Sequence, residues 1–268
     1  MPAEPDAAGE IIVGAETIDL QGANSCGVLL LHGFGDTPQT FQLLAEHLHA
    51  GGFGVRAPLL PGHGRSIEKF VSSRRAQWTD FARQELAEFR QRYATVGLTG
   101  LSMGGTIAAV LAAENLDLPA LVLIAPYIGM PWDYRLVSAA GWLWGPVAGT
   151  RKSRSPGSIH DPIEREKNLG YGVYTGRLLY ELWRLTHEAQ RALPLIRTPT
   201  LLIQSKADPR VGRAIAEHAF ASLRMADKRL VWTEGAGHVI TVDYGRERVF
   251  EEVAGWLRDH MRAAVATA

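Results

Sequence analysis

The chain has 268 residues, of which 46% are apolar, and its 28 basic residues equal its 28 acidic residues, so the formal net charge is zero. A chain of this length and composition can bury one sizeable core, which favours a single domain that carries an insertion. Because no net charge attracts nucleic acid or an anionic membrane surface, we expect a small, weakly charged molecule as the partner.

The first ten residues carry acids where a secretory signal would carry a basic region, so residues 1–10 are expected to form a disordered or frayed tail. Cys26 is the only cysteine, which excludes a disulfide framework and a cysteine-based metal site. The stretch "LVSAAGWLWGPVAG" is too short and too interrupted by glycine to span a bilayer. We therefore expect a cytoplasmic protein, monomeric or weakly dimeric, with no stable membrane insertion.

Short apolar runs that end in glycine, proline, aspartate or histidine recur along the chain. They are "GVLLLHGF", "FGVRAPLLPGHG", "TVGLTG", "ALVLIAP", "PTLLIQSKAD" and "KRLVWTEGAGH". Runs that are apolar throughout, without alternation, are typical of parallel strands covered on both faces.

Amphipathic helical patterns separate these runs. A first helix begins at a Thr37 cap with Pro38 in its first turn and ends at Gly51, a second follows "QWTDFARQELAEFRQRY", and a third presents an apolar face from Val249 to Met261. The aromatic residues on these faces are expected to pack in the core. Alternating strands and helices predict an α/β fold, a mostly parallel twisted sheet with helices on both faces, whose ligands bind beyond the carboxyl ends of the strands.

Residues 127–195 break the alternation, because they contain no clear strand but hold four tryptophans and a polar, basic loop. So long a connection in a compact domain is usually functional. We call residues 127–195 the cap segment and expect a small cap, inserted after the sixth strand, that divides the core into residues 11–126 and 196–268. An ordinary helical excursion with no ligand role stays the alternative.

The sequence "GLSMG" at Gly100–Gly104 matches the G-x-S-x-G motif and lies between a predicted strand and a predicted helix. A sharp strand-to-helix turn strains the backbone of the central residue and holds its hydroxyl above the sheet, at the positive end of the helix dipole. Ser102 is therefore the expected nucleophile, and a purely structural glycine turn is the alternative.

A serine nucleophile needs a base and an acid that orients the base, and in this fold they follow the serine in the order acid, histidine. Asp208 lies just past one strand end, and His238 lies in the loop after the last strand. We expect His238 to act as general base and Asp208 to hold its tautomer. An ordinary turn cap is the alternative role for Asp208, and Asp133 is the alternative acid.

Acyl transfer also needs backbone donors for the oxyanion. The expected donors are the N–H groups of Phe34, in the loop after the first central strand, and of Met103, directly after the nucleophile. We expect an apolar pocket walled by Phe34, Met103 and residues of the cap segment. His32 and His63 are expected to have structural roles.

Five stretches, "LLLHGF", "LPGHG", "GLSMGG", "LLIQSKADPRV" and "GHVITVDYGRERVFEEVAGWLRDH", together resemble the α/β-hydrolase superfamily. The last one looks most like the bacterial monoacylglycerol lipase and carboxylesterase branch. The resemblance implies a mostly parallel sheet with a small cap, hydrolysis of carboxylic esters without cofactor or metal, Ser102, His238 and Asp208 as a triad, and oxyanion donors at Phe34 and Met103. It does not extend to the residues of the cap segment, so it implies nothing about recognition of the alcohol.

Three functions are compatible with the sequence. The first is a serine hydrolase of monoacylglycerols or other short- to medium-chain acyl esters. The second is a lysophospholipase or thioesterase with the same triad, for which Arg151, Lys152 and Arg154 would supply positive charge. The third is a non-catalytic small-molecule binding protein on a hydrolase scaffold.

Overall fold

The computed structural model describes residues 10–153 and 157–267. The tail expected at residues 1–10 lies outside this part of the chain except for Glu10, which is exposed, and Arg154 lies outside it as well.

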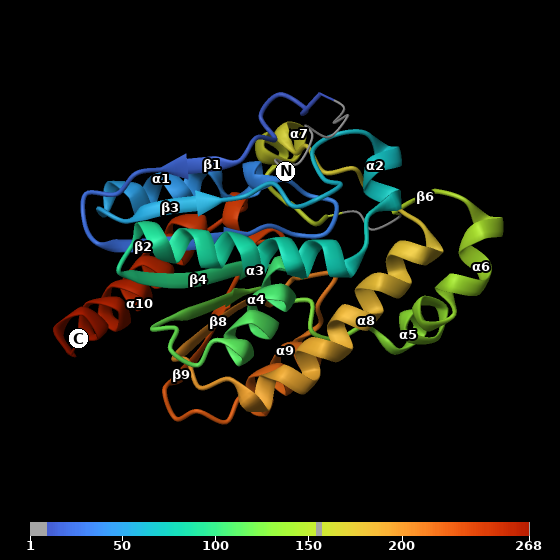
Figure 1. Ribbon diagram of the computed structural model, residues 1–268. Helices are drawn as coiled ribbons and strands as arrows, with labels where there is room; N and C mark the ends of the chain where they lie inside the picture. The colour runs from blue at the N-terminus through green and yellow to red at the C-terminus, as the bar shows by residue number, and fades with distance from the viewer. Residues whose placement is uncertain (1–9, 154–156, 268) are drawn as a thin grey trace, which may run out of the picture.

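A sheet of seven strands forms the centre of the described structure (Figure 1). The strand bounds are Ile18–Leu20 (β1), Cys26–Leu31 (β2), Gly54–Ala57 (β3), Thr95–Leu101 (β4), Leu121–Ile124 (β5), Thr200–Ser205 (β8) and Lys228–Thr233 (β9). The strands lie in the order β1-β3-β2-β4-β5-β8-β9, and β1 runs antiparallel to β3 while the other neighbours pair in parallel. The mostly parallel sheet is confirmed.

All six predicted strands are present, and every residue of β2, β4, β5 and β8 is buried, as expected for strands covered on both faces. The expectation of full burial is wrong for β9, where only Thr233 is buried, because this strand lies at the edge of the sheet. β1 was not predicted, since its three partly exposed residues carry too little apolar pattern to indicate a strand.

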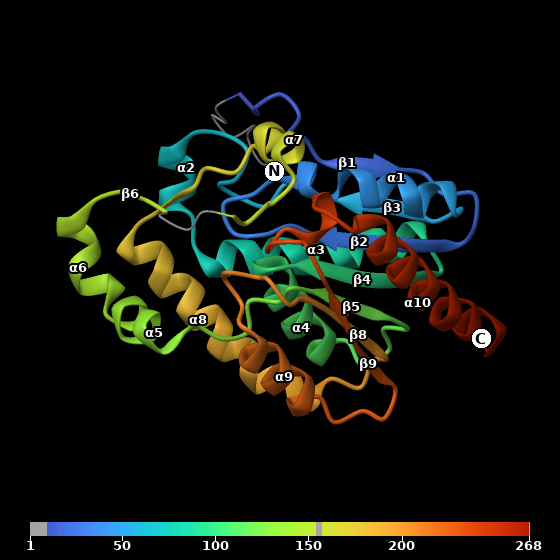
Figure 2. The same cartoon turned by 180° about the vertical axis from the view of Figure 1, so that it is seen from behind.

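Helices cover both faces of the sheet. Their bounds are Gln42–Ala50 (α1), Ile67–Ser72 (α2), Arg75–Arg92 (α3), Met103–Glu114 (α4), Trp132–Ala139 (α5), Gly141–Ala148 (α6), Pro162–Lys167 (α7), Gly176–Ala192 (α8), Arg213–Ser222 (α9) and Arg246–Thr267 (α10). Three short 3₁₀ turns span Pro38–Phe41 (η1), Leu193–Leu195 (η2) and Ile240–Val242 (η3). α3, α4 and α8 lie on one face, and α1 and α10 lie on the other (Figure 1, Figure 2).

The two faces carry separate apolar clusters. Trp78 and Phe89 of α3 are buried in the cluster under α3, α4 and α8, whereas Phe41 and Trp256 belong to the cluster under α1 and α10. The core role predicted for these aromatic residues is confirmed.

The first helix differs in detail from the prediction. Residues 38–41 form the 3₁₀ turn η1 before α1 begins, and Thr37 precedes this turn in an extended conformation without a side-chain capping bond. Pro38 occupies the first turn as expected, because its fixed backbone angle suits that position.

The cap segment holds α5, α6, α7, α8 and two short strands, Arg151–Lys152 (β6) and Val173–Tyr174 (β7), which pair with each other. It follows β5, the fifth strand in chain order among the described residues, so the expected insertion after a sixth strand is wrong. Four of the six predicted strands, together with β1, precede the cap segment.

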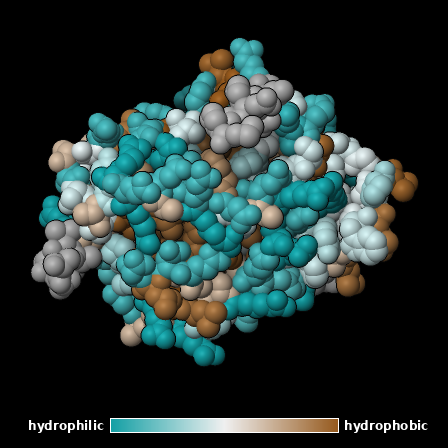
Figure 3. All heavy atoms as spheres, in the orientation of Figure 1, coloured by the Kyte–Doolittle hydropathy of each residue, from teal (hydrophilic) through white to brown (hydrophobic). Residues whose placement is uncertain are grey.

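α5 and α6 pack on α8 and leave an apolar surface at one edge of the molecule, at the right of Figure 3. Its most exposed side chains are Leu136 and Val147, at 78% and 91%. Over the described part of the chain, no helix combines the length and the hydropathy needed to cross a membrane.

A tight contact at the start of α4 fixes the turn that carries Ser102. A Cβ built on Gly104 would overlap the carbonyl group of Leu31, at the end of β2, so the helix can approach the strand only with glycine at this position.

We therefore predict that Gly104→Ala lowers the free energy of unfolding by about 3 kcal/mol or more, measured by urea denaturation. Gly255→Ala is the matched control, because Gly255 lies in α10 with open space around its Cβ position. This control should leave stability unchanged or raise it by about 0.5–1 kcal/mol. Equal effects of the two changes would contradict the proposed contact.

Candidate active site

Ser102 lies between β4 and α4 with a backbone φ of 54° and ψ of −117°, a conformation that non-glycine residues rarely adopt. Its N–H donates to Ile124 O at 2.9 Å, and its carbonyl oxygen accepts from the N–H groups of Thr106 and Tyr127. The Thr106 hydroxyl also donates to the Ser102 carbonyl oxygen, at 3.1 Å. These bonds from three segments hold the strained turn in place.

His238 lies in the loop after β9, and its ring reaches the serine. The distance from His238 Nε2 to Ser102 Oγ is 2.7 Å. The backbone N–H groups of His238 and Val239 both donate to Ser158 O, at 2.8 and 2.9 Å, so a loop of the cap segment holds this part of the chain in place.

Asp208 follows β8 and contacts the other ring nitrogen of His238, with 2.8 Å between His238 Nδ1 and Asp208 Oδ2. The side chain of Asp208 is fully buried. Its Oδ1 accepts from the N–H groups of Arg210 and Val211, so the turn-cap role considered for Asp208 occurs together with the contact to His238.

Burial raises the pKa of the Asp208 carboxyl, but the adjacent His238 and the backbone donors lower it more, so the pKa of Asp208 lies below its ordinary value. The ionised carboxylate accepts a hydrogen bond from Nδ1–H, which leaves Nε2 unprotonated and able to accept the Ser102 hydroxyl proton. Gln204, at the end of β8, donates through Nε2 to Asp208 Oδ2 at 2.7 Å. The sequence reasoning missed Gln204, although its place at a strand end four residues before Asp208 was a usable signal.

Ser102 and His238 open into a cavity of about 1100 Å³ between the carboxyl ends of the strands and the cap segment. Phe34 lines it, as expected, together with apolar residues of α8 such as Leu179 and Leu182. The Met103 side chain does not, because it is completely buried in the core under α4. The expected apolar lining is also incomplete, since charged side chains contribute to the wall.

The backbone N–H groups of Phe34 and Met103 come from the two segments that flank Ser102, the loop after β2 and the first turn of α4. Neither N–H donates to another group in residues 10–153 and 157–267. Two unpaired donors beside a hydroxyl form a site that can accept a developing oxyanion.

His32 and His63 help to fix the loop after β2. His32 Nε2 accepts from Leu60 N at 3.0 Å, and its Nδ1 contacts Gly33 O at 3.0 Å, which confirms a structural role. His63 packs edge to face against the ring of His32. Burial lowers the pKa of both rings, to about 4 for His63, so both imidazoles are neutral at neutral pH.

Asp36 is a second acidic group near Ser102, and the sequence reasoning missed it. A Cβ built on Gly33 would lie 2.6 Å from Asp36 Oδ2 and 3.4 Å from Ser102 Cβ, so the carboxyl is close to Ser102. No hydrogen bond joins the Asp36 carboxyl to the described residues, and burial raises its pKa to about 6. An acid two residues after the predicted oxyanion donor Phe34 was the available signal.

The alternative acid, Asp133, belongs to α5, and its side chain lies outside the described part of the structure. Within the described residues, no group of three or more His, Cys, Asp or Glu is placed to hold a metal ion.

The parallel sheet, the strained serine turn and the histidine loop define an α/β-hydrolase fold. Residues 23–244 match the family model described as Serine aminopeptidase, S33, and the chain belongs to this family.

Relatives named as lipases or esterases match most of the chain. The thermostable monoacylglycerol lipase of Bacillus sp. (strain H-257) is 29% identical over 252 residues, covering 93% of this chain and 97% of the relative. The carboxylesterase of Bacillus subtilis (strain 168) is 25% identical and covers 86% of this chain and 91% of the relative. A solved structure reported for LipS and LipT, two metagenome-derived lipolytic enzymes, superposes with a TM-score of 0.85 at 27% identity, covering 94% of this chain and 100% of that one.

These similarities confirm the predicted superfamily and its monoacylglycerol lipase and carboxylesterase branch. The chain is an enzyme of the hydrolase class.

The raised pKa of Asp36 predicts a pH-dependent effect of Asp36→Asn. A carboxyl whose pKa is higher in the folded than in the unfolded chain destabilises the fold progressively as pH rises from about 4 to about 6. The amide of asparagine does not ionise, so the variant avoids this destabilisation. Between pH 4.5 and pH 8 its free energy of unfolding should rise by about 1–2 kcal/mol relative to that of wild type, measured by urea denaturation.

Asp259→Asn is the control for this prediction, because Asp259 is exposed on α10. A difference between Asp36→Asn and wild type that stays constant with pH would show that Asp36 does not titrate in this range.

Proposed function

We propose that the chain is a serine carboxylic-ester hydrolase that acts on monoacylglycerols or other short- to medium-chain acyl esters. The observation that carries this proposal is the continuous hydrogen-bonded path from Asp208 through His238 to Ser102, with distances of 2.8 and 2.7 Å, at the wall of a cavity of about 1100 Å³. Ser102 is the nucleophile, His238 the general base and Asp208 the acid that orients it.

Acylation begins when Ser102 Oγ attacks the ester carbonyl carbon while its proton passes to His238 Nε2. The negative charge that develops on the carbonyl oxygen is stabilised by the backbone N–H groups of Phe34 and Met103. When the tetrahedral intermediate collapses, the bond to the alcohol oxygen breaks and the leaving alkoxide takes the proton from His238 Nε2. The alcohol departs and the acyl group remains on Ser102.

Deacylation repeats these steps with water. His238 Nε2 takes a proton from the water, whose oxygen attacks the acyl carbon, and the bond to Ser102 Oγ then breaks as the serine regains the proton. The products are a carboxylic acid and the free enzyme. Buried, ionised Asp208 stabilises the imidazolium that forms in both halves of the reaction.

The apolar wall supports acyl chains as the substrate. Phe34, Leu179, Leu182 and Val173 line the same cavity as Ser102, and apolar side chains contribute binding energy roughly in proportion to the buried surface. A lysophospholipase or thioesterase would use the same three catalytic residues and differ in the leaving group. A non-catalytic binding protein would have no use for the path between Asp208 and Ser102.

We predict that Ser102→Ala and His238→Gln each lower kcat for p-nitrophenyl butyrate by about 10⁴-fold or more, because each removes the nucleophile or its base. Asp208→Ala should depress turnover far more than Asp133→Ala, which is the matched control. The release of p-nitrophenolate, followed in a spectrophotometer, measures all four rates.

Wild-type protein that releases no p-nitrophenolate above background would identify a binding protein. A greater loss in Asp133→Ala than in Asp208→Ala would move the acid to Asp133.

A further inference from the structure

The wall of the active-site cavity carries an excess of positive charge. Four basic side chains line it, and among the described lining residues Asp36 is the one acid. The four are Arg151, Lys152, Arg165 and Arg210. Since the whole chain has as many acids as bases, this excess is local to the cavity.

Some arginines elsewhere on the described surface pair with carboxylates. Arg83 pairs with Glu114 at 2.8 Å, and Arg92 pairs with Asp19 at 2.8 Å. None of the four basic residues of the cavity forms such a pair within residues 10–153 and 157–267. Arg210 also interacts electrostatically with Asp36, but with four basic residues and one acid the lining keeps a positive charge that a bound molecule can meet.

Arg210 differs from the other three in having a side-chain hydrogen bond to another described residue. It lies two residues after Asp208, is half-buried, and its Nε donates to Ser158 Oγ at 3.1 Å. No further hydrogen bond of the guanidinium to the described residues occupies its terminal nitrogens. Arg165 comes from α7 and Lys152 from β6, so the cap segment supplies the other cations.

We infer that the cavity binds esters whose alcohol part carries a negative charge, a phosphate or a carboxylate, and that Arg210, Arg165 and Lys152 recognise this charge. Guanidinium groups suit both anions, because their N–H donors match two oxygens at once. The apolar residues of α8 remain for the acyl chain. The inference rests on the proposed ester hydrolysis and names its substrate class.

Paired substrates with one acyl chain test the inference. The phosphate pair is 1-octanoylglycerol 3-phosphate and 1-octanoylglycerol, and the carboxylate pair is O-octanoyl-lactate and O-octanoyl-lactamide. We expect kcat/KM to be about tenfold higher for the anionic member of at least one pair, because a charge-assisted hydrogen bond contributes to its binding. As the NaCl concentration is raised, this kcat/KM should fall toward that of the neutral member.

The variants Arg210→Gln and Arg165→Gln should each reduce the ratio of anionic to neutral kcat/KM by about fivefold to tenfold, because each removes one recognising charge. Arg197→Gln, at an exposed position outside the cavity, should leave the ratio unchanged.

A preference for the phosphate pair alone identifies a phosphorylated alcohol, and a preference for the lactate pair alone identifies a carboxylated one. Hydrolysis of the neutral esters without any anionic preference overturns this inference and leaves the proposed function standing. If none of the four esters is hydrolysed, both fail.

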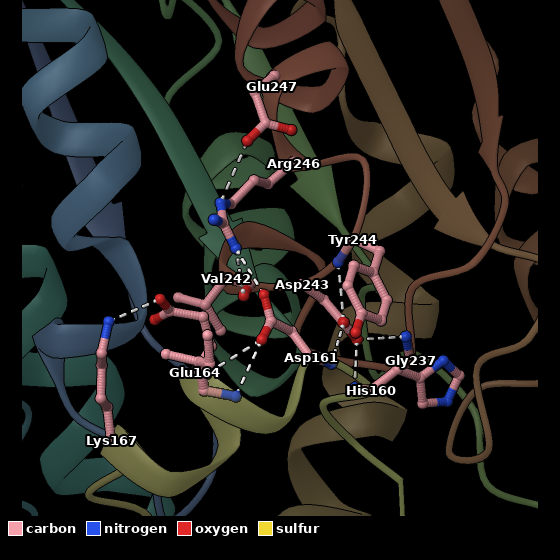
Figure 4. Close-up of polar contacts among 11 residues, drawn as sticks. His160, Asp161, Glu164, Lys167, Gly237, Val242, Asp243, Tyr244, Arg246 and Glu247 are labelled. Carbon is pink, nitrogen blue, oxygen red and sulfur yellow. Dashed lines mark hydrogen bonds and ion pairs between the residues drawn. The ribbon is translucent and has the colours of Figure 1, made fainter.

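A different observation concerns Asp243, five residues after His238 and completely buried. Its carboxylate accepts four backbone N–H groups, from Gly237 at 2.6 Å, His160 at 2.8 Å, Asp161 at 2.9 Å and Tyr244 at 2.8 Å (Figure 4). These donors belong to the His238 loop, the cap segment and the turn before α10.

The cap residues held by Asp243 also touch the His238 loop directly. Ser158 O accepts from the N–H of His238, and His160 Nδ1 contacts Gly235 O at 2.7 Å. Asp161 in turn caps α7 through Ile163 N at 3.0 Å. One buried carboxylate thus ties the loop that carries the catalytic base to the segment that crosses it.

We propose that Asp243 is a positioning residue, whose carboxylate holds His238 within reach of Ser102. In Asp243→Asn the amide oxygen can replace one carboxylate oxygen, but the NH₂ group faces N–H donors and leaves them unpaired. Misplacing the base should lower kcat about tenfold or more while KM changes much less.

The measurement is kcat for p-nitrophenyl butyrate per active site, with sites counted by titration with paraoxon, for Asp243→Asn and Asp243→Glu. The longer Glu side chain keeps the charge but shifts the oxygens, so its kcat should be intermediate. Asp259→Asn, on the exposed side of α10, is the matched control. If either variant folds and its kcat per titrated site equals that of wild type, Asp243 has only a structural role and the proposal is overturned.

Discussion

The backbone conformation of Ser102 is the constraint on which the site depends. At φ 54° and ψ −117° the backbone of this residue is strained. The residue keeps this conformation only because the surrounding hydrogen bonds and the close approach of strand and helix impose it. This approach requires glycine at positions 100 and 104, where any Cβ would overlap backbone atoms. The hydroxyl is in consequence directed out of the sheet, at the N-terminus of α4 and next to two backbone donors with no other acceptor among the described residues.

Much of this arrangement could be predicted from the sequence, for a physical reason. Ser102, Asp208 and His238 each follow a strand, and the carboxyl ends of parallel strands meet at the same edge of the sheet. Local patterns therefore specified which residues lie at that edge. The distances of 2.7 and 2.8 Å that join the three side chains agree with the predicted triad, although their catalytic roles remain our proposal.

Other features depend on contacts that no local pattern encodes. Asp36 faces the cavity because the turn after β2 folds back on Gly33, and the four basic residues of the cavity come from segments far apart in the sequence. The edge position of β9, which exposes most of that strand, follows from the order of the sheet and not from its own residues.

In our proposals, the cap segment takes part in both substrate recognition and the positioning of His238. The same stretch that supplies basic side chains to the cavity wall also accepts the backbone N–H of His238 through Ser158 and donates two N–H groups to Asp243.

A single covalent label tests the central claim, that Ser102 is the nucleophile. Paraoxon should release one equivalent of p-nitrophenolate per chain, abolish esterase activity and leave its diethylphosphoryl group on the peptide that contains Ser102, as read by mass spectrometry. A label on another residue, or full esterase activity in labelled protein, would contradict the account.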